Sequence, residues 1–477
     1  MIKDKIKNSI CYIPLKYILG KYCYYKPIRL RYGKAFVETW KLLNKTEFLT
    51  EDEIKEYQLR QLKNIIYHSY QNVPYYTKLF DRNSIKPENI KNFEDLKKIP
   101  YLTKDIINQH REEMIDKNFP KKYLGYGTTG GSTGIPMGFY FDKRTYASVE
   151  WAYMTHQWKR VGYKYRDKCV VLRGNVVKYI VENKKYWEMD WANNWLIMSS
   201  YHLTDNTIPL YINKIRKFKP KFIQAYPSAL QIFVSYMKVN NIKPFESVKA
   251  IFCGSENIYE WQRKLFKEVL KTRVYSWYGH SERVCLAGEC EQSHYYHSFP
   301  QYGYLELVND KGEWCTVEDE KGEIVATGFT NYVMPFIRYK TQDIAINTNK
   351  NCECGRNWKL IKNVEGRLQD YVIGKNNESI TLTALIFAQH FKAFSKIKNM
   401  QLFQNIKGEV VVRIIENEKL QDNDKNEIIS KMKNASDNSL RIILKFVNQI
   451  PRTKNGKYRF LIQELPIRFG DRNNENI

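Results

Sequence analysis

The stretch GYGTTGGSTGIPMGFY, residues 125–140, concentrates glycine, serine and threonine between apolar and aromatic residues. Its glycines allow several backbone N–H groups to face one point, and its hydroxyl groups add further hydrogen-bond donors, which suits a polyphosphate. The residues concerned are Thr129, Gly130, Gly131, Ser132, Thr133 and Gly134. A flexible linker has a similar composition, and neither GxxxxGK[ST] nor GxGxxG is met here. The stretch by itself therefore leaves a phosphate loop and a linker open.

The segments that follow this stretch predict an α/β domain with parallel strands. Residues 141–162 form an amphipathic helical pattern, and short apolar runs bounded by turn residues come next. These runs are KCVVLRG (168–174), KFIQAYP (221–227) and VKAIFCGS (248–255), with helical segments between them. Strands that alternate with helices are typical of a parallel sheet covered by helices.

The rest of the chain predicts two further kinds of structure. Residues 35–115 read as helices, with Thr103 as a helix cap, and the runs after residue 300 alternate as strands. Residues beyond 368 mix helix and strand. We therefore expect three parts: a basic aromatic segment at 1–40, a large domain at 41–367 and a small domain at 368–477.

The net charge of +26 raises nucleic acid as a partner, but the lysines are spread along the chain and no reader motif appears, so we expect none. The excess is sharpest in residues 1–34, where nine Lys and Arg stand against Asp4. This segment suits contact with an anionic membrane surface or a helix packed on the domain behind it, and both remain open. No apolar run approaches the roughly 18 residues that span a bilayer, and lysines interrupt any signal core. With nine cysteines, this favours the cytoplasm, either free or peripheral at the inner membrane face.

Five further motifs follow the glycine-rich stretch in order. They are CGSEN (253–257), WYGHSE (277–282), RYKTQD (338–343), VEGRLQD (364–370) and PRTKNGKYR (451–459). Together with GSTGIP (131–136), they resemble the signatures of the adenylate-forming superfamily, which includes acyl-CoA synthetases and peptide-synthetase adenylation domains. Met137 replaces the lysine that is usual after the loop proline. Met137 and the segments HSYQNVPYYTKLF (68–80) and CECGR (352–356) resemble the phenylacetate–CoA ligase branch, and particularly its CapK-like capsular-polysaccharide members.

The resemblance implies a fold and a reaction. The fold is a large N-terminal domain of parallel sheets and helices with a β-rich subdomain, followed by a small, mobile α+β domain. The reaction joins a carboxylic or amino acid to AMP, releases pyrophosphate, and passes the acyl group to CoA or to an amine or hydroxyl on a sugar-linked acceptor. The alternatives are an adenylyltransferase of the coenzyme F390 synthetase type and a non-catalytic scaffold. A homodimer, the acid and the acceptor are left open.

The resemblance also assigns site residues. Ser132, Thr133 and the rest of the loop would hold the ATP phosphates, and Lys457 would contact the carboxylate and the α-phosphate. Glu282, supported by Ser281, would bind Mg²⁺, and Tyr278 would stack on adenine. The remaining nucleotide contacts would come from Gly254, Ser255, Glu256, Gly279, Asp343 and Arg367. Two residues depart from the family pattern: Gln342 stands where glycine is usual, and Gln369 lies at the hinge.

Four residues suggest a second metal. Cys290 and His297 flank a short loop, and Cys352 and Cys354 follow about 55 residues later. Three thiolates and one imidazole form a closed ligand set that suits structural Zn²⁺. His294 is a rival imidazole, and reduced buried cysteines are the alternative to a metal site.

Overall fold

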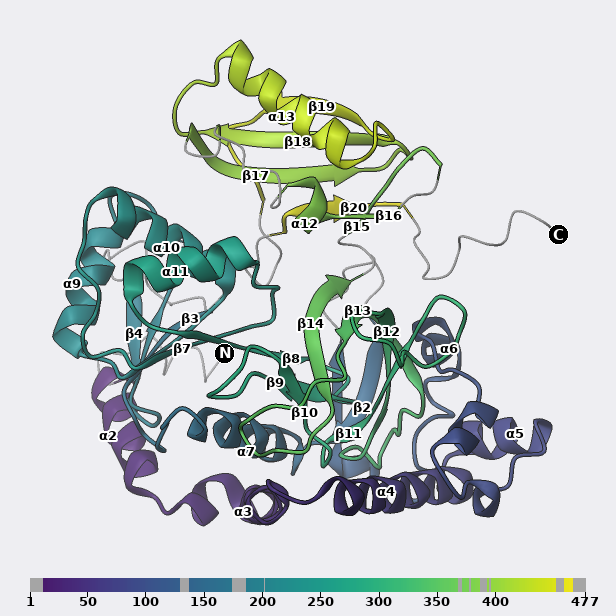
Figure 1. Cartoon of the computed structure of the whole chain (residues 1–477). Helices are drawn as coiled ribbons and strands as arrows, with labels where there is room; N and C mark the ends of the chain where they lie inside the picture. The colour runs from purple at the N-terminus through teal and green to yellow at the C-terminus, as the bar shows by residue number, and fades with distance from the viewer. Residues whose placement is uncertain are drawn as a thin grey trace.

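The chain forms a large body built on one sheet and a smaller part that lies above it (Figure 1). A computed structural model describes residues 12–128, 137–173, 186–200, 202–367, 371–376, 379–386, 393, 396–451 and 459–465. The sheet of the large body has twelve strands in the order β11-β12-β13-β14-β10-β9-β8-β7-β6-β3-β5-β4. The predicted fold class, an α/β domain followed by a small α+β part, is confirmed.

One half of the large sheet is parallel and contains the three apolar runs noted in the sequence. Its parallel strands are β3 (Cys169–Leu172), β5 (Trp195–Met198), β6 (Phe222–Ala225), β7 (Ala250–Gly254) and β8 (Val274–Gly279), with β4 (Trp187–Asp190) antiparallel at the edge. The helices α9 (Ile208–Phe218), α10 (Pro227–Val239) and α11 (Glu260–Leu270) connect them. Buried side chains from these strands and helices form one hydrophobic cluster, which explains why the strands read as continuous apolar runs.

The β-rich region predicted after residue 300 begins earlier, at residue 286, and continues the same sheet as antiparallel strands. These are β9 (Leu286–Gly288), β10 (Tyr296–Ser298), β11 (Gly303–Val308), β12 (Lys321–Gly328), β13 (Tyr339–Asn347) and β14 (Leu360–Arg367). The hairpin of β1 (Leu124–Thr128) and β2 (Gly138–Asp142) precedes α7 (Tyr146–Lys159). Strand β9 pairs with β8, so backbone hydrogen bonds join the parallel and antiparallel halves without a break.

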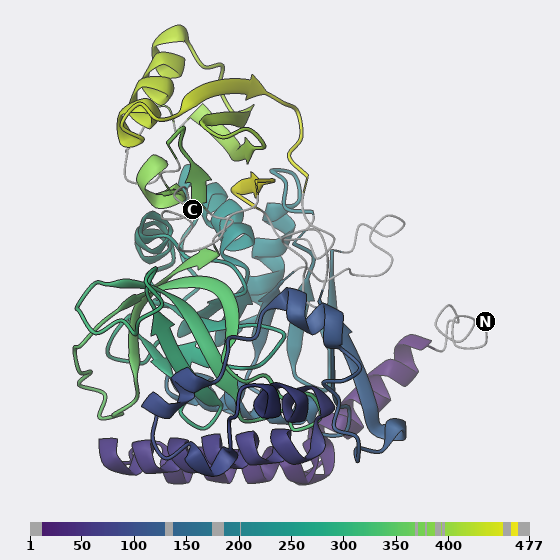
Figure 2. The ribbon, with the colours of Figure 1, turned by 90° about the vertical axis from the view of Figure 1, so that its right-hand side faces the viewer.

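Long helices underlie the sheet at its base (Figures 1 and 2). The longest are α3 (Ile28–Thr46) and α4 (Glu51–Asn72); α2 (Tyr12–Tyr25) precedes them, and the shorter α5 (Pro74–Arg82) and α6 (Lys104–His110) follow at the side of the large body. A capping box begins α4: Glu53 N–H donates to Thr50 Oγ1, and the Glu53 carboxylate accepts from Thr50 N–H at 2.8 Å. Thr103 caps α6 as predicted. No helix in the described ranges is both long and apolar enough to cross a membrane.

The smaller part has its own sheet and its own hydrophobic cluster. Its elements are β15 (Tyr371–Ile373), β16 (Ser379–Thr381), α12 (Leu382–Leu385), β17 (Ile397–Gln404), β18 (Glu409–Glu416), α13 (Asp422–Ala435), β19 (Arg441–Phe446) and β20 (Leu461–Gln463). It lies above the rest of the molecule in both views (Figures 1 and 2). The domain boundary that the sequence suggests, at residue 368, falls outside the described residues.

A buried ion pair holds the N-terminal helical segment against the sheet. Arg338 Nη2 donates to Glu306 Oε1 at 2.9 Å, and both side chains are almost completely buried. Arg338 Nη1 also donates to the Ile99 carbonyl at 2.9 Å, and Leu102 pairs with Tyr339 at the start of β13. The pair therefore links β11, β13 and the chain before α6.

We expect the substitution Glu306→Ala to destabilise the large body by about 3–5 kcal/mol, because it leaves the Arg338 charge buried without its carboxylate. Urea unfolding followed by tryptophan fluorescence measures this loss as a lower midpoint. Glu113→Ala is the control, since it removes an exposed ion pair with Lys78 and should leave the midpoint unchanged. Equal midpoints for the two variants would show that the buried pair does not hold the segment.

Candidate functional site

The candidate site begins where the parallel strands end. The register pairs Ala225 with Cys253 and Gly254 with Trp277, so β6, β7 and β8 end at one edge of the sheet. In open α/β sheets, ligands bind outside this carboxyl edge. At Gly254 an added Cβ would lie 2.6 Å from the Trp277 indole, so only glycine allows the two strands to approach this closely.

The CGSEN loop after β7 is fixed by its own side chains. Ser255 adopts a φ of 67°, which turns the chain sharply. The Glu256 carboxylate accepts from Ser228 N–H at 3.0 Å and from Ser228 Oγ at 3.1 Å. Of the predicted adenine-border residues, Gly254 and Ser255 therefore lie at the strand edge, while the Glu256 carboxylate binds the first turn of α10.

Tyr278 and Asp343 meet across the sheet although 65 residues separate them. Tyr278 Oη donates to Asp343 Oδ2 at 2.7 Å, and the Asp343 side chain is buried. Burial and the Asp343 carboxylate raise the pKa of Tyr278 well above its ordinary value. The phenol therefore stays protonated and donates to the carboxylate.

Gln342, which replaces the usual glycine of the RYKTQD motif, has a φ of 64°. This left-handed conformation favours glycine and costs roughly 1–2 kcal/mol for other residues. Gln342 is held there by Glu323 Oε1, which accepts from its backbone N–H at 3.0 Å. The turn that directs Asp343 toward Tyr278 is therefore kept without the glycine.

Glu282 is a buried carboxylate with two polar neighbours. Tyr339 Oη donates to Glu282 Oε1 at 2.9 Å, and His280 Nδ1 lies 3.3 Å from Oε2. Burial acts to raise the pKa of Glu282, but the hydrogen bond and charge of His280 outweigh it and hold the pKa at about 2. Glu282 therefore carries a full negative charge, as a ligand of a hard cation requires.

The described end of the glycine-rich stretch lies beside Glu282. Met137 is fully buried, and its Sδ is 4.0 Å from Tyr339 Oη, the group that binds Glu282. On the other side, Thr128 pairs with Gly138 in the β1–β2 hairpin. The two strands that flank residues 129–136 are therefore paired with each other, while those residues lie outside the described ranges.

Lys104 is a site residue that sequence reasoning missed. It begins α6, its Nζ donates to Gln342 Oε1 at 3.1 Å, and its charge contributes to the low pKa of Glu282. Two features of the sequence could have identified it: Lys104 follows directly after the Thr103 cap, and the glycine-rich stretch lacks its own lysine at Met137.

Several predicted site residues lie wholly or partly outside the described residues. The backbone of Arg367 pairs with Asp343 on β13, but its side chain is not described. Gly279 ends β8, and the Ser281 carbonyl accepts from Tyr146 Oη at 2.8 Å. The residues wholly outside are Thr129, Gly130, Gly131, Ser132, Thr133, Gly134, Gln369 and Lys457.

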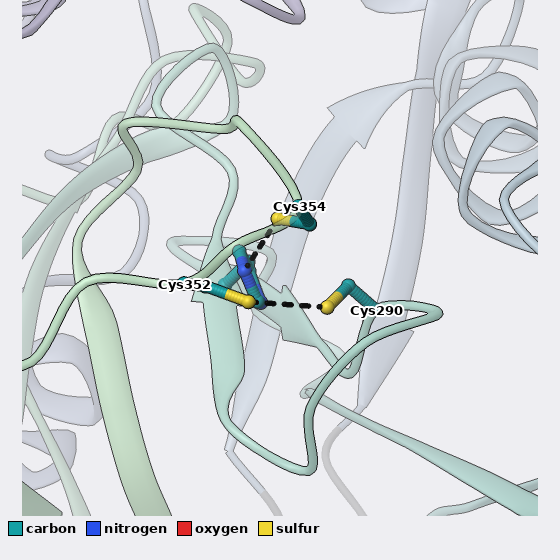
Figure 3. Close-up of side chains that lie close together, drawn as sticks. Cys290, Cys352 and Cys354 are labelled. Carbon is teal, nitrogen blue, oxygen red and sulfur yellow. Dashed lines mark hydrogen bonds between the residues drawn. The ribbon is translucent and has the colours of Figure 1, made fainter.

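The four proposed zinc ligands converge (Figure 3). The ligand atoms of Cys290, His297, Cys352 and Cys354 all lie within 4.8 Å of one another. Cys354 Sγ is 3.2 Å from His297 Nε2, and Cys290 Sγ is 3.5 Å from Cys352 Sγ. Tetrahedral Zn²⁺ with Zn–S bonds of about 2.3 Å needs ligand separations of roughly 3.5–3.8 Å. The donor set and its spacing therefore fit Zn²⁺.

The hydrogen bonds of the two histidines decide between them. His297 Nδ1 is 3.1 Å from the Tyr295 carbonyl, which can only accept, so Nδ1 carries the proton and Nε2 is left with a lone pair for a metal. His294 Nδ1 instead lies 3.0 Å from the Glu289 carboxylate, outside the cluster. The rival imidazole is therefore not a member of the ligand set.

The zinc-type cluster lies away from the carboxyl edge. Strand β9 runs antiparallel to β8 and leads from Gly279 back toward the start of β8, and Cys290 follows it. Next to Cys354, Arg356 binds Glu47 after α3 and Glu291 beside Cys290. The cluster therefore joins the β9–β10 and β13–β14 loops near the N-terminal helices.

The resemblance also implies an acyl pocket, for which the candidates are Trp151, Tyr153, His156, Tyr226, Pro227, Ser228 and Gly254. The structure divides these candidates into two groups. Tyr153 packs edge-on against Tyr302, and His156 is buried 3.5 Å from the Glu47 carboxylate, so both are core residues of α7. Trp151 packs against Trp158 in the same core. Tyr226, Pro227 and Ser228 instead follow β6 at the carboxyl edge.

The sequence of the chain is similar to those of several known proteins. A family model of the CapK C-terminal domain matches residues 372–464. The chain is 26% identical to Protein CapK of Staphylococcus aureus over 92% of this chain and 94% of that protein. It is 25% identical to the phenylacetate-coenzyme A ligase of Thermus thermophilus over 87% of this chain and 97% of that one.

A solved structure shares the fold. The 2-hydroxyisobutyryl-CoA ligase in the postadenylation state superposes with a TM-score of 0.68, over 88% of this chain and 91% of that one, at 15% identity. The resemblance inferred from the motifs is confirmed by these matches. The chain is therefore similar to Protein CapK and to the phenylacetate-coenzyme A ligases over most of its length, and it shares the fold of the 2-hydroxyisobutyryl-CoA ligase.

Proposed function

We propose that the chain is an AMP-forming ligase that activates a carboxylic acid with ATP. The observation that carries the proposal is the meeting of three motifs at one edge: Tyr278 bonds to Asp343, and Glu282 lies beside Met137 at the end of the glycine-rich stretch. A nucleotide needs an aromatic face, an acceptor for ribose hydroxyls and a cation site, and these residues supply all three.

Adenylation joins two anions, and the proposed roles follow from that difficulty. A carboxylate oxygen of the acid bonds to the α-phosphorus as the bond to the bridging oxygen breaks, and pyrophosphate leaves with the electron pair. Asp343 would accept from the ribose hydroxyls, with Arg367 nearby, and Tyr278 would face the adenine. Glu282 would hold Mg²⁺, which neutralises phosphate charge when it is bound. The loop donors, from Thr129 to Gly134, would hold the β- and γ-phosphates.

Lysines complete the proposed charge balance. Lys457 would bring its ammonium to the α-phosphate from the smaller C-terminal part. Lys104 would supply the positive charge that Met137 lacks, because its ammonium already lies near Gln342 and Glu282.

In the second step we propose transfer of the acyl group to an acceptor. The acceptor sulfur, nitrogen or oxygen bonds to the acyl carbon, the bond to AMP breaks, and the acceptor proton is released. CoA is one acceptor class, and a sugar-linked amine or hydroxyl in surface-polysaccharide assembly is the other. Similarity to CapK supports the second, and similarity to the phenylacetate–CoA ligases supports the first.

ATP–pyrophosphate exchange over a panel of carboxylic and amino acids tests the first step. We expect Lys457→Ala to lower the exchange rate by about a hundredfold or more, since it removes a charge that acts in the transition state. Asp343→Ala should mainly raise the KM for ATP. Asp52→Ala, an exposed change on α4, is the control. Full exchange by Lys457→Ala would refute the lysine assignment, and mass spectrometry of the products separates acyl-CoA, acyl-amide, ester and adenylylated acceptor.

We further propose that the Cys290–His297–Cys352–Cys354 cluster holds a structural Zn²⁺. The supporting observations are the closed four-ligand set and the protonated Nδ1 of His297. The ion would join the β9–β10 and β13–β14 loops and take no part in adenylation.

Metal analysis by mass spectrometry should find one zinc per chain. Cys354→Ser should lower this content and the melting temperature together, because the ion links segments about 60 residues apart. Cys23→Ser is the control, since Cys23 lies on α2, far from the cluster in sequence. Zinc-free protein with an unchanged melting temperature would exclude a structural metal.

We also propose that α2 contacts an anionic membrane surface. Ile18, Leu19, Tyr22 and Tyr25, here called the α2 surface, are each more than half exposed. The exposed cations Arg29 and Lys34 follow at the start of α3. The helix lies at the periphery of the molecule (Figures 1 and 2). Apolar side chains bordered by cations suit the interface of an anionic bilayer.

Vesicle sedimentation tests this contact. The protein should bind phosphatidylcholine vesicles that contain phosphatidylserine more tightly than vesicles without it, and high salt should weaken binding. The double change Ile18→Glu and Leu19→Glu should reduce binding about tenfold. Val239→Glu, at an exposed valine on α10, is the control. If all three proteins bind equally, the α2 surface is not the contact.

A further inference from the structure

Arg173 is a half-buried cation at the carboxyl edge that the proposed mechanism does not use. It follows β3 directly, so it lies in the row of strand ends that holds Tyr226 after β6 and Ser255 after β7. Its Nη2 donates to Ser255 Oγ at 2.8 Å. The side chain therefore reaches across β6 to the loop beyond β7.

The surroundings of Arg173 do not balance its charge. Its Nε is buried and has no hydrogen-bond partner in the described part of the chain. The Glu256 carboxylate acts on Arg173 electrostatically, but its hydrogen bonds go to Ser228. Burial lowers the pKa of Arg173 although Tyr226, Cys253 and Glu256 act in the opposite direction. The half-buried guanidinium has no carboxylate in hydrogen-bond contact within the described residues, so it can take an anion from solution.

The shape of the surroundings fits a flat group. The guanidinium carbon lies 5.2 Å from the Tyr226 ring centre and 5.4 Å from the Trp277 ring centre. The rings of Tyr226 and Trp277 thus border the guanidinium, so a ligand can reach it only along the edge of its plane. The fork of a guanidinium matches the two oxygens of a carboxylate, which it can bind with parallel hydrogen bonds.

Strand geometry places Arg173 away from the Tyr278–Asp343 pair, although its partner Ser255 belongs to the loop that is predicted to contact the nucleotide. Trp277 and Tyr278 are consecutive on β8, so their side chains point to opposite faces of the sheet. Tyr278 bonds to Asp343 on one face, whereas Trp277 lies near Arg173 on the other. The anion that Arg173 would bind therefore lies beside Tyr226, one of the acyl-pocket candidates, and away from the Tyr278–Asp343 pair.

We infer that the acid substrate is a dicarboxylic acid and that Arg173 binds its second carboxylate, the one that is not activated. The inference rests on the proposed ligase function and narrows its substrate class. Arg173 is then a specificity-determining residue: it selects acids with two carboxylates and rejects those that leave it unpaired.

Matched pairs of acids test this inference in the exchange assay. The probes are succinate, glutarate, adipate and isophthalate, each beside its monomethyl ester, which keeps one carboxylate and removes the second charge. The wild type should prefer at least one diacid over its ester by about ten- to a hundredfold in kcat/KM. Arg173→Met should remove this preference by raising the KM for the diacid, with the KM for ATP unchanged. Arg173→Lys should restore part of it, and Arg441→Met, on exposed β19, is the control.

The outcomes separate the two proposals. Two results would overturn the dicarboxylate inference and leave the ligase function intact. One is exchange that is as fast with the esters as with the diacids. The other is an Arg173→Met variant that loses kcat/KM equally for all acids and for ATP. If no acid supports exchange, the proposed ligase function fails. The Arg173 site is then tested by the shift in melting temperature that the same acids cause in the presence of AMP. A diacid-specific shift that Arg173→Met abolishes would support the site, and its absence would overturn it. Melting curves of the unliganded variants show whether each one folds.

Discussion

The common register of the parallel strands is the constraint on which the site depends. Buried backbone N–H and C=O groups must be paired, and parallel pairing of β3, β6, β7 and β8 brings their carboxyl ends to one edge. Arg173, Tyr226, Gly254 and Tyr278 are neighbours for this reason alone. Because β9 continues the ladder from β8, the same pairing places β13, and with it Asp343, within reach of Tyr278.

Most charged groups at the site have a partner that offsets their charge, and Arg173 differs from them. Glu282 is balanced by His280, Asp343 by the Tyr278 hydroxyl, and Glu306 by Arg338. Each of these contacts offsets the cost of taking a charge or an acceptor out of water. Arg173 has no such carboxylate in the described structure. This contrast within one sheet edge is the reason to assign Arg173 to a ligand.

The proposed nucleotide site and the cysteine–histidine cluster lie at different edges of the same sheet. The carboxyl edge of the parallel strands carries Gly254, Tyr278 and Glu282, whereas the cysteine–histidine cluster lies toward the start of β8. Arg356 extends that cluster to the N-terminal helices through Glu47. A metal there could hold loops together without changing the charge around the proposed nucleotide.

The sequence by itself determined the fold class, three of the parallel strands and the motifs of the candidate site, because these are local patterns in the chain. It also named the four metal-type ligands. The tertiary structure alone decided that His297 rather than His294 joins them, that Gln342 keeps the left-handed turn of a glycine, and that Lys104 and Arg173 face the site. Such contacts join residues far apart in the chain. They follow from strand register and side-chain reach, which local sequence patterns do not encode.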